Sequence, residues 1–324
     1  MPEKLALVFP GQGSQYVGMG LDLYEQYPEA RAIYEKADHV LGLPLSGLCF
    51  EGPESDLNDT INTQVAVLCT SLATLNAMGG MEQVSGTCLV AGHSLGEYTA
   101  LVAAGAISFA DALRLVRERG RLMKEAGERR PGGMAAVLGL PSETVSEACD
   151  RARRETGTMI QVANHNLPDQ IVISGEHQGL RRAAEILKEK GARRVITLAV
   201  SIASHSPLME SAAEGLKHTL SEVKLTRASI PVVGNVTARP LTEAREIAQE
   251  LVQQLVSPVQ WVSSVGFMLE EGVRTFVEIG PKDVLSKLIK RMAGEAQALS
   301  VSDAVAVEAW RVGGAPGQED AGET

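Results

Sequence analysis

The chain of 324 residues has few aromatic side chains, four cysteines and no excess of basic residues. Aromatic residues make up only 4%, so the core that the 44% of hydrophobic residues can form must be mostly aliphatic. The formal net charge of −10 argues against a general nucleic-acid binder, which needs a basic surface to displace counterions. The cysteines match no metal-binding spacing and predict reduced, mostly buried thiols: Cys49, Cys69, Cys88 and Cys149.

Long hydrophobic runs are also missing. The N-terminal run Leu5–Phe9 ends at Pro10 and is too short for a signal peptide. The longest apolar stretch, from about Tyr98 to Ala110, cannot span a bilayer and indicates a buried helix. We therefore expect a cytoplasmic protein that contacts neither membrane nor nucleic acid.

Short apolar runs alternate with amphipathic stretches along most of the chain, which predicts an α/β fold with a parallel sheet flanked by helices. The segment 131–199 has the order β-α-β-β-α-β of a ferredoxin-like module, with a hairpin around Asn166 to Asp169. We expect this smaller α+β subdomain to be inserted into a discontinuous large domain, 1–130 and 200–312. The Gly-, Pro- and acid-rich tail 313–324 is expected to be disordered. The strands of the large domain are expected at 5–9, 88–91, 230–236 and 275–279.

The sequence Gly92–Gly96 (GHSLG) fits the G-x-S-x-G nucleophile elbow. Its glycines permit a sharp turn from strand to helix, and this turn exposes the hydroxyl of Ser94. A strand is predicted before the motif and a helix after it, as the chemistry requires. The alternative is an ordinary buried turn.

A serine hydroxyl needs a general base within hydrogen-bond reach, and the chain has six histidines. We expect His205, which follows an apolar run where the chain returns to the large domain, to be this base. His165 is a second candidate, in the predicted hairpin turn. His93 is held on the other side of the elbow. The other three are expected in polar surface positions: His39, His177 and His218.

Arg119 lies on a predicted helix in the same stripe as Ala112, Val116 and Met123, so its charge faces the core and needs an anionic partner. That partner is either an internal carboxylate or the carboxylate of a substrate, gripped by the guanidinium fork. The loop Gly11–Gly13 after the first strand can present an N–H to a reacting carbonyl, cradle a phosphate, or merely turn the chain.

Together these segments resemble the malonyl-CoA:acyl carrier protein transacylases over roughly residues 4–295. The resemblance rests on six motifs in order: Phe9–Gln15, Gly92–Tyr98, Arg119–Gly120, Gly133–Ala136, Ser204–His205 and Ser257–Trp261. It implies a hydrolase-like core domain with an inserted ferredoxin-like subdomain. The implied partners are malonyl-CoA and an acyl carrier protein, with no metal and no cofactor beyond the coenzyme A thioester substrate.

The resemblance also implies residue roles. Ser94 would carry the malonyl group as an ester, and His205 would act as base and then as acid. Arg119 would bind the malonyl carboxylate. The resemblance gives the oxyanion donors as the N–H groups of Gln12 and Leu95, and Gln260 or its carbonyl as the group that orients the histidine. Further candidates for substrate contact are Met123, Asn164 and Ser204.

Loop departures from the family pattern, at 165, 167, 169 and 282–283, spare these residues but leave open the carrier contacts and the acyl-chain tolerance. The pathway is expected to be fatty acid synthesis, and Ser204 before the histidine resembles that type. The alternatives are a free-standing acyltransferase of a polyketide pathway, a serine esterase or thioesterase, and a non-catalytic scaffold.

Overall fold

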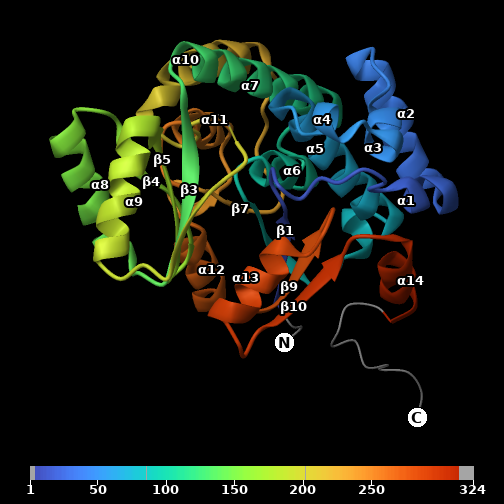
Figure 1. Ribbon diagram of the computed structural model, residues 1–324. Coiled ribbons are helices and arrows are strands. Elements are labelled where there is room, and N and C mark those ends of the chain that lie inside the picture. Colours follow the sequence, from blue (N-terminus) through green and yellow to red (C-terminus); the bar gives the residue numbers. More distant parts are fainter. Residues whose placement is uncertain (1–3, 85, 201, 314–324) are drawn as a thin grey trace.

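The computed structural model describes residues 4–84, 86–200 and 202–313, which are organised around two sheets (Figure 1). The larger sheet has six strands in the order β10-β9-β1-β2-β7-β8. Its strands are parallel, except that β8 runs antiparallel to β7 at the edge. The strands are β1 (Lys4–Phe9), β2 (Thr87–Gly92), β7 (Val232–Val233), β8 (Pro240–Leu241), β9 (Val273–Ile279) and β10 (Gln297–Val301).

Helices cover both faces of this sheet, and the alternation of side chains along β1 explains why. Leu5, Leu7 and Phe9 belong to the core cluster under α5, α6 and α7, whereas Ala6 and Val8 belong to the cluster under α12 and α13. The helices are α1 (Leu21–Gln26), α2 (Pro28–Leu41), α3 (Leu45–Glu51), α4 (Glu54–Leu57), α5 (Thr60–Ala77), α6 (Gly96–Ala103), α7 (Phe109–Arg129), α10 (Glu210–Glu222), α11 (Ala244–Gln254), α12 (Trp261–Glu270), α13 (Val284–Met292) and α14 (Ala304–Gly313), with short 3-10 turns η1 (Met81–Gln83) and η2 (Pro207–Met209).

The second sheet has four strands in the order β4-β5-β3-β6, and all its neighbouring strands are antiparallel. Its elements follow one another as β3 (Gly132–Leu138), α8 (Ser142–Thr156), β4 (Ile160–Leu167), β5 (Gln170–Glu176), α9 (His177–Glu189) and β6 (Arg194–Thr197). Helices α8 and α9 pack on one face, at the left of Figure 1. This connectivity and strand order are those of a ferredoxin-like module, so the predicted fold class is confirmed.

Strand β4 of the small sheet is hydrogen-bonded to the segment between α11 and α12. The N–H of Val259, between α11 and α12, donates to the carbonyl of Ala163, and the carbonyl of Val259 accepts from the N–H of His165. The other face of the small sheet carries Met134 and Val172, which line a cavity between the sheets. The small sheet therefore forms one wall of a cavity that is also lined by Gln12, His93 and Ser94, which follow β1 and β2 of the large sheet.

Several predicted boundaries are wrong. The apolar stretch 98–110 is not one helix, because α6 ends at Ala103, Gly105 adopts a φ of 70°, and Ser108 caps α7. The expected strand 230–236 is only the two-residue β7, and β10 was not predicted. His165 lies in β4 rather than in a turn.

Gly313, at the start of the predicted tail, is the last residue of α14, and 314–324 lie outside the described residues. All four cysteines are unpaired; three are buried and Cys88 is half-buried. Among the described helices, none combines the length and the apolar character that a membrane span needs.

Candidate active site

Ser94 lies on a sharp turn between β2 and α6. Its backbone has a φ of 51°, a conformation that residues other than glycine seldom adopt. Two neighbouring glycines make this turn possible. A Cβ on Gly92 would lie 1.9 Å from the carbonyl carbon of Gly96, and a Cβ on Gly96 would lie 2.0 Å from the carbonyl oxygen of Phe9. The G-x-S-x-G spacing therefore reflects a backbone too tight for any Cβ at either glycine.

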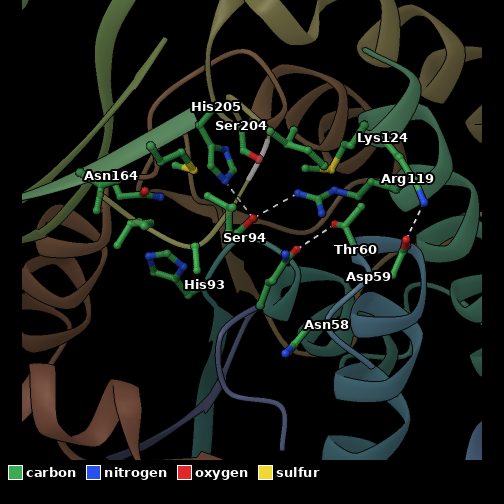
Figure 2. A pocket seen from close by; sticks show the side chains of 18 of the residues that line it. Asn58, Asp59, Thr60, His93, Ser94, Arg119, Lys124, Asn164, Ser204 and His205 are labelled. Atoms are coloured by element: carbon green, nitrogen blue, oxygen red, sulfur yellow. Dashed lines mark hydrogen bonds and ion pairs between the residues drawn. The ribbon is translucent and has the colours of Figure 1, made fainter. Parts of the chain in front are cut away.

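The ring of His205 lies against this serine, although the two residues are far apart in sequence (Figure 2). The Oγ of Ser94 is 2.9 Å from Nε2 of His205, and Nδ1 of the ring is 2.7 Å from the carbonyl oxygen of Gln254. Because a carbonyl can only accept, Nδ1 carries the hydrogen and Nε2 is free to accept the serine proton. His205 also has a positive φ, of 59°.

The group that orients His205 is Gln254 and not Gln260, so that prediction is wrong. Gln260 caps the start of α12; its N–H donates to the carbonyl of Asn235, and its own carbonyl accepts from Ser264. Gln254 is the last residue of α11, where carbonyl groups have no partner within the helix. The end of α11 thus supplies the acceptor that a carboxylate supplies in many serine hydrolases.

Burial lowers the pKa of His205 from 6.5 to about 3, and the positive charge of Arg119 adds to the effect. The contact with the carbonyl of Gln254 acts in the opposite direction. His205 is therefore neutral in the free protein at any ordinary pH, which is the state that a general base requires.

Arg119 is 1% exposed, and the predicted stripe of Ala112, Val116, Arg119 and Met123 is buried along α7. Its guanidinium reaches Ser94: Nη2 donates to the serine Oγ at 3.1 Å. Its remaining hydrogen bonds are with two side-chain amides, not with carboxylates: Gln64 at 2.8 Å from Nη1 and Gln254 at 3.0 Å from Nη2. The guanidinium carbon also lies 5.4 Å from the centroid of the Tyr98 ring.

The charge of Arg119 is not compensated by an ion pair with any Asp or Glu that the structure describes, and its Nε–H has no partner. Burial accordingly lowers the pKa of Arg119. Taking a guanidinium out of water is costly unless an anion joins it. Of the two alternatives that the sequence left open, the internal ion pair is not formed, and a site for an external anion remains.

The N–H groups of Gln12 and Leu95 have no acceptor among the described residues. Gln12 lines the cavity beside Ser94, and Leu95 follows the serine at the start of α6. The loop that carries Gln12 approaches the elbow closely, because a Cβ on Gly11 would lie 2.4 Å from the carbonyl oxygen of His93. Two unpaired N–H groups, one in the loop after β1 and one at the start of α6, are suited to stabilise a developing oxyanion.

The cavity has a volume of about 320 Å³. Met123, Asn164 and Ser204 line it, together with a central group formed by Ser94, Arg119 and His205. Figure 2 shows Asn164 and Ser204 beside this group. The Sδ atom of Met123 accepts from the side-chain amide nitrogen of Gln64 at 3.4 Å. His165 is outside this cavity and contacts Ser142, so its candidacy as the base is not supported.

Sequence reasoning missed three polar residues of the site. Asn235 accepts from the N–H of Ser94 at 2.6 Å and donates to the carbonyl of Gly92 at 2.6 Å. It follows β7, the neighbour of β2, and the carboxyl ends of parallel strands share one edge, which is a signal that could have found it. Gln64, a buried amide in the apolar helix α5, and Gln254 had no such signal.

The arrangement can form and break an ester on Ser94. It combines a hydroxyl, a neutral imidazole that accepts its proton, two N–H groups for an oxyanion and a buried cation beside the hydroxyl. Within the described residues there is no cluster of three His, Cys, Asp or Glu side chains fit to hold a metal ion. Fold and geometry together define an α/β enzyme of the serine acyl-transfer class.

Comparison with known proteins shows which family within this class the chain is similar to. Residues 6–315 match the family model described as "Acyl transferase domain". The malonyl CoA-acyl carrier protein transacylase of Bacillus subtilis is 46% identical over 94% of this chain and 95% of its own. The crystal structure of an acyl carrier protein S-malonyltransferase from Vibrio cholerae has a TM-score of 0.91 at 41% identity, covering 95% and 99% of the two chains.

A malonyl-transacylase solved in complex with a type II polyketide acyl-carrier protein is equally similar. Its TM-score is 0.92 at 40% identity, and the match covers 96% of this chain and all of that one (100%). The chain belongs to the acyl transferase family.

Proposed function

We propose that the protein transfers a malonyl group from malonyl-CoA to the phosphopantetheine thiol of an acyl carrier protein in fatty acid synthesis. The observation that carries this proposal is the buried guanidinium of Arg119, which reaches Ser94 Oγ and has no carboxylate partner in the described chain. A malonyl group has a free carboxylate close to its thioester carbon. It therefore supplies the missing anion at the point where the reaction takes place.

The first half-reaction loads the serine. The Oγ of Ser94 attacks the thioester carbon while its proton passes to Nε2 of His205. The resulting oxyanion accepts hydrogen bonds from the N–H groups of Gln12 and Leu95. The carbon–sulfur bond then breaks, and the proton on His205 goes to the sulfur of coenzyme A as it leaves.

The second half-reaction repeats these steps in reverse order. The thiol of the carrier gives its proton to His205 as its sulfur attacks the ester carbon, and the proton returns to Ser94 as the carbon–oxygen bond breaks. Each proton lost is regained, so the cycle needs no oxidant, no metal and no cofactor beyond the thioester. The kinetics are of the ping-pong type.

Arg119 determines the selectivity in this scheme. Its Nε–H is unpaired, and a carboxylate oxygen can replace Ser94 as a partner of Nη2 once the serine is acylated. Met123, Asn164 and Ser204 contact the acyl group or the pantetheine arm from the wall of the cavity. Malonyl groups are thereby preferred to acetyl groups, which leave the buried charge without an anion.

Labelling tests the proposal directly. The protein is incubated with malonyl-CoA labelled in the malonyl group, and the protein-bound label is mapped by proteolysis and mass spectrometry. We expect one label on Ser94, none in Ser94→Ala, and release of the wild-type label when a carrier protein with its phosphopantetheine arm is added. A stable label on another residue, or release into water at the same rate without carrier, contradicts the proposal.

The similarity to the malonyl-transacylase solved with a polyketide carrier supports a second candidate, in which the acceptor is a carrier of a polyketide pathway. The chemistry is unchanged, and rates of transfer to one carrier of each type distinguish the two. A serine esterase is a weaker alternative, since it gives no use to a buried Arg119 without a carboxylate partner in the described chain.

Two further assignments belong to this proposal. Residues 131–199 act as a subdomain that covers the acyl group, on the large domain formed by 1–130 and 200–312. The reaction takes place in the cytoplasm, which suits the unpaired thiols of the described chain.

A further inference from the structure

Glu97 is a buried carboxyl group in the first turn of α6 that the proposed reaction does not use. Burial, together with the nearby Glu250, raises its pKa well above the usual value. Its side chain is 1% exposed. Its Oε2 accepts from the main-chain N–H of Asn235 at 3.2 Å and from the side-chain amide of Gln254 at 2.8 Å. These two partners are the residues whose side chains hold the main chain of Ser94.

Gln254 contacts each member of the central group. Its main-chain carbonyl accepts from His205, its side-chain oxygen accepts from Arg119 at 3.0 Å, and its side-chain nitrogen donates to the carbonyl of Ser94 at 3.0 Å. A guanidinium can only donate and a carbonyl can only accept, so one orientation of the amide satisfies both. In that orientation the second amide hydrogen points at Glu97, which accepts it.

We propose that Glu97 is a positioning residue that directs Arg119 and His205 at Ser94 through Gln254. This inference rests on the proposed function, because discrimination in favour of a carboxylate-bearing acyl group is the property that it affects. Without the carboxyl oxygen of Glu97, the side-chain N–H of Gln254 and the main-chain N–H of Asn235 lose their acceptor. The side-chain amide of Gln254 then rotates to hydrogen-bond with another group. Arg119 then loses the acceptor that fixes its Nη2.

The alternative is that Glu97 only stabilises the fold, and the chain offers a matched control for it. Glu278 in β9 is also a fully buried glutamate that accepts two hydrogen bonds, from the main-chain N–H groups of Leu285 and Ser286 at 3.0 and 2.7 Å. It does not line the cavity. Loss of its carboxylate thus costs stability in a similar way without touching the group around Ser94.

The experiment measures kcat and KM of transfer from malonyl-CoA and acetyl-CoA in four variants: Glu97→Leu, Glu97→Asp, Glu97→Gln and Glu278→Leu. We expect Glu97→Leu to lower the malonyl-to-acetyl ratio of kcat/KM about tenfold, equivalent to about 1.4 kcal/mol. Glu97→Asp has a side chain one methylene shorter, which cannot reach both donors, and we expect it to lower the ratio about fivefold. Because it keeps a polar group in the site, it tests the inference even if the leucine variant does not fold.

Glu97→Gln retains an acceptor oxygen at the same distance, so it keeps the ratio within about twofold of the wild type. Glu278→Leu lowers the thermal midpoint and leaves the ratio unchanged. An unchanged ratio in Glu97→Asp, or the same fall in Glu278→Leu as in the Glu97 variants, overturns the inference. If the wild-type protein is itself not labelled on Ser94 by malonyl-CoA, the proposed function fails instead, and the two failures are thereby distinguished.

Discussion

Replacing Arg119 with methionine removes a buried charge while keeping a long unbranched side chain. In the free protein the guanidinium donates to Gln64, to Gln254 and to the Oγ of Ser94, and its Nε–H is unpaired. If the malonyl carboxylate takes two of these N–H groups, each charged hydrogen bond contributes roughly 1.5–3 kcal/mol. The variant then loses about 3–6 kcal/mol of malonyl recognition, or roughly 10²–10⁴ in kcat/KM.

The acetyl group is the internal reference for this loss. Both acyl groups use the same hydroxyl, base and oxyanion donors, so the lost contact between Arg119 and Ser94 affects the two substrates alike and cancels in their ratio. We therefore measure kcat/KM for malonyl-CoA and acetyl-CoA side by side. Arg119→Lys keeps the charge but not the planar fork, and we expect an intermediate ratio. A ratio that Arg119→Met changes less than tenfold refutes the assignment of the carboxylate to this residue.

Because burial and Arg119 lower the pKa of His205 to about 3, the neutral base persists far below the usual value of 6.5. A pH profile of kcat/KM between 8 and 5 therefore lacks a fall near 6.5, and a midpoint there contradicts the neutral buried ring. Gly96→Ala places a Cβ 2.0 Å from the carbonyl oxygen of Phe9. We therefore expect the free energy of unfolding, measured in urea, to fall by about 3 kcal/mol or more. Gly266→Ala in α12, where a Cβ has open space, is the control and stabilises by up to ~1 kcal/mol; equal effects contradict the close approach.

The sequence was informative where a local pattern determines the structure. The spacing of Gly92, Ser94 and Gly96 reports a backbone that only glycine permits, and the helical stripe that includes Arg119 reports burial. Both signals are contained within a few turns of chain. The β-α-β-β-α-β order likewise identified the small sheet, because alternating periodicities reveal the type and order of elements even where their boundaries are inexact.

The partners of His205 and Arg119 could not be found in this way. Gln254 and Gln260 are both polar residues near the same chain reversal, and which of them meets the histidine depends on where α11 ends. Gln64 is one buried amide in an apolar helix, and only the packing of α5 against α7 brings it to the guanidinium. Such contacts are set by tertiary packing, for which a single sequence carries no periodic signal.

In this site the imidazole of His205 and the guanidinium of Arg119 both donate hydrogen bonds to uncharged oxygen atoms. His205 faces a carbonyl rather than a carboxylate, and Arg119 faces two amides. A carboxylate at either place would cancel the charge of Arg119 or make His205 more basic before any substrate arrived. With neutral partners the positive charge of Arg119 persists and depresses the pKa of His205. A bound malonyl carboxylate neutralises that charge and so raises the pKa of His205. The substrate itself therefore makes His205 a stronger base when this residue has to accept the serine proton. An acetyl group lacks the carboxylate and so leaves the base weak, which makes selectivity a matter of reactivity as well as of binding.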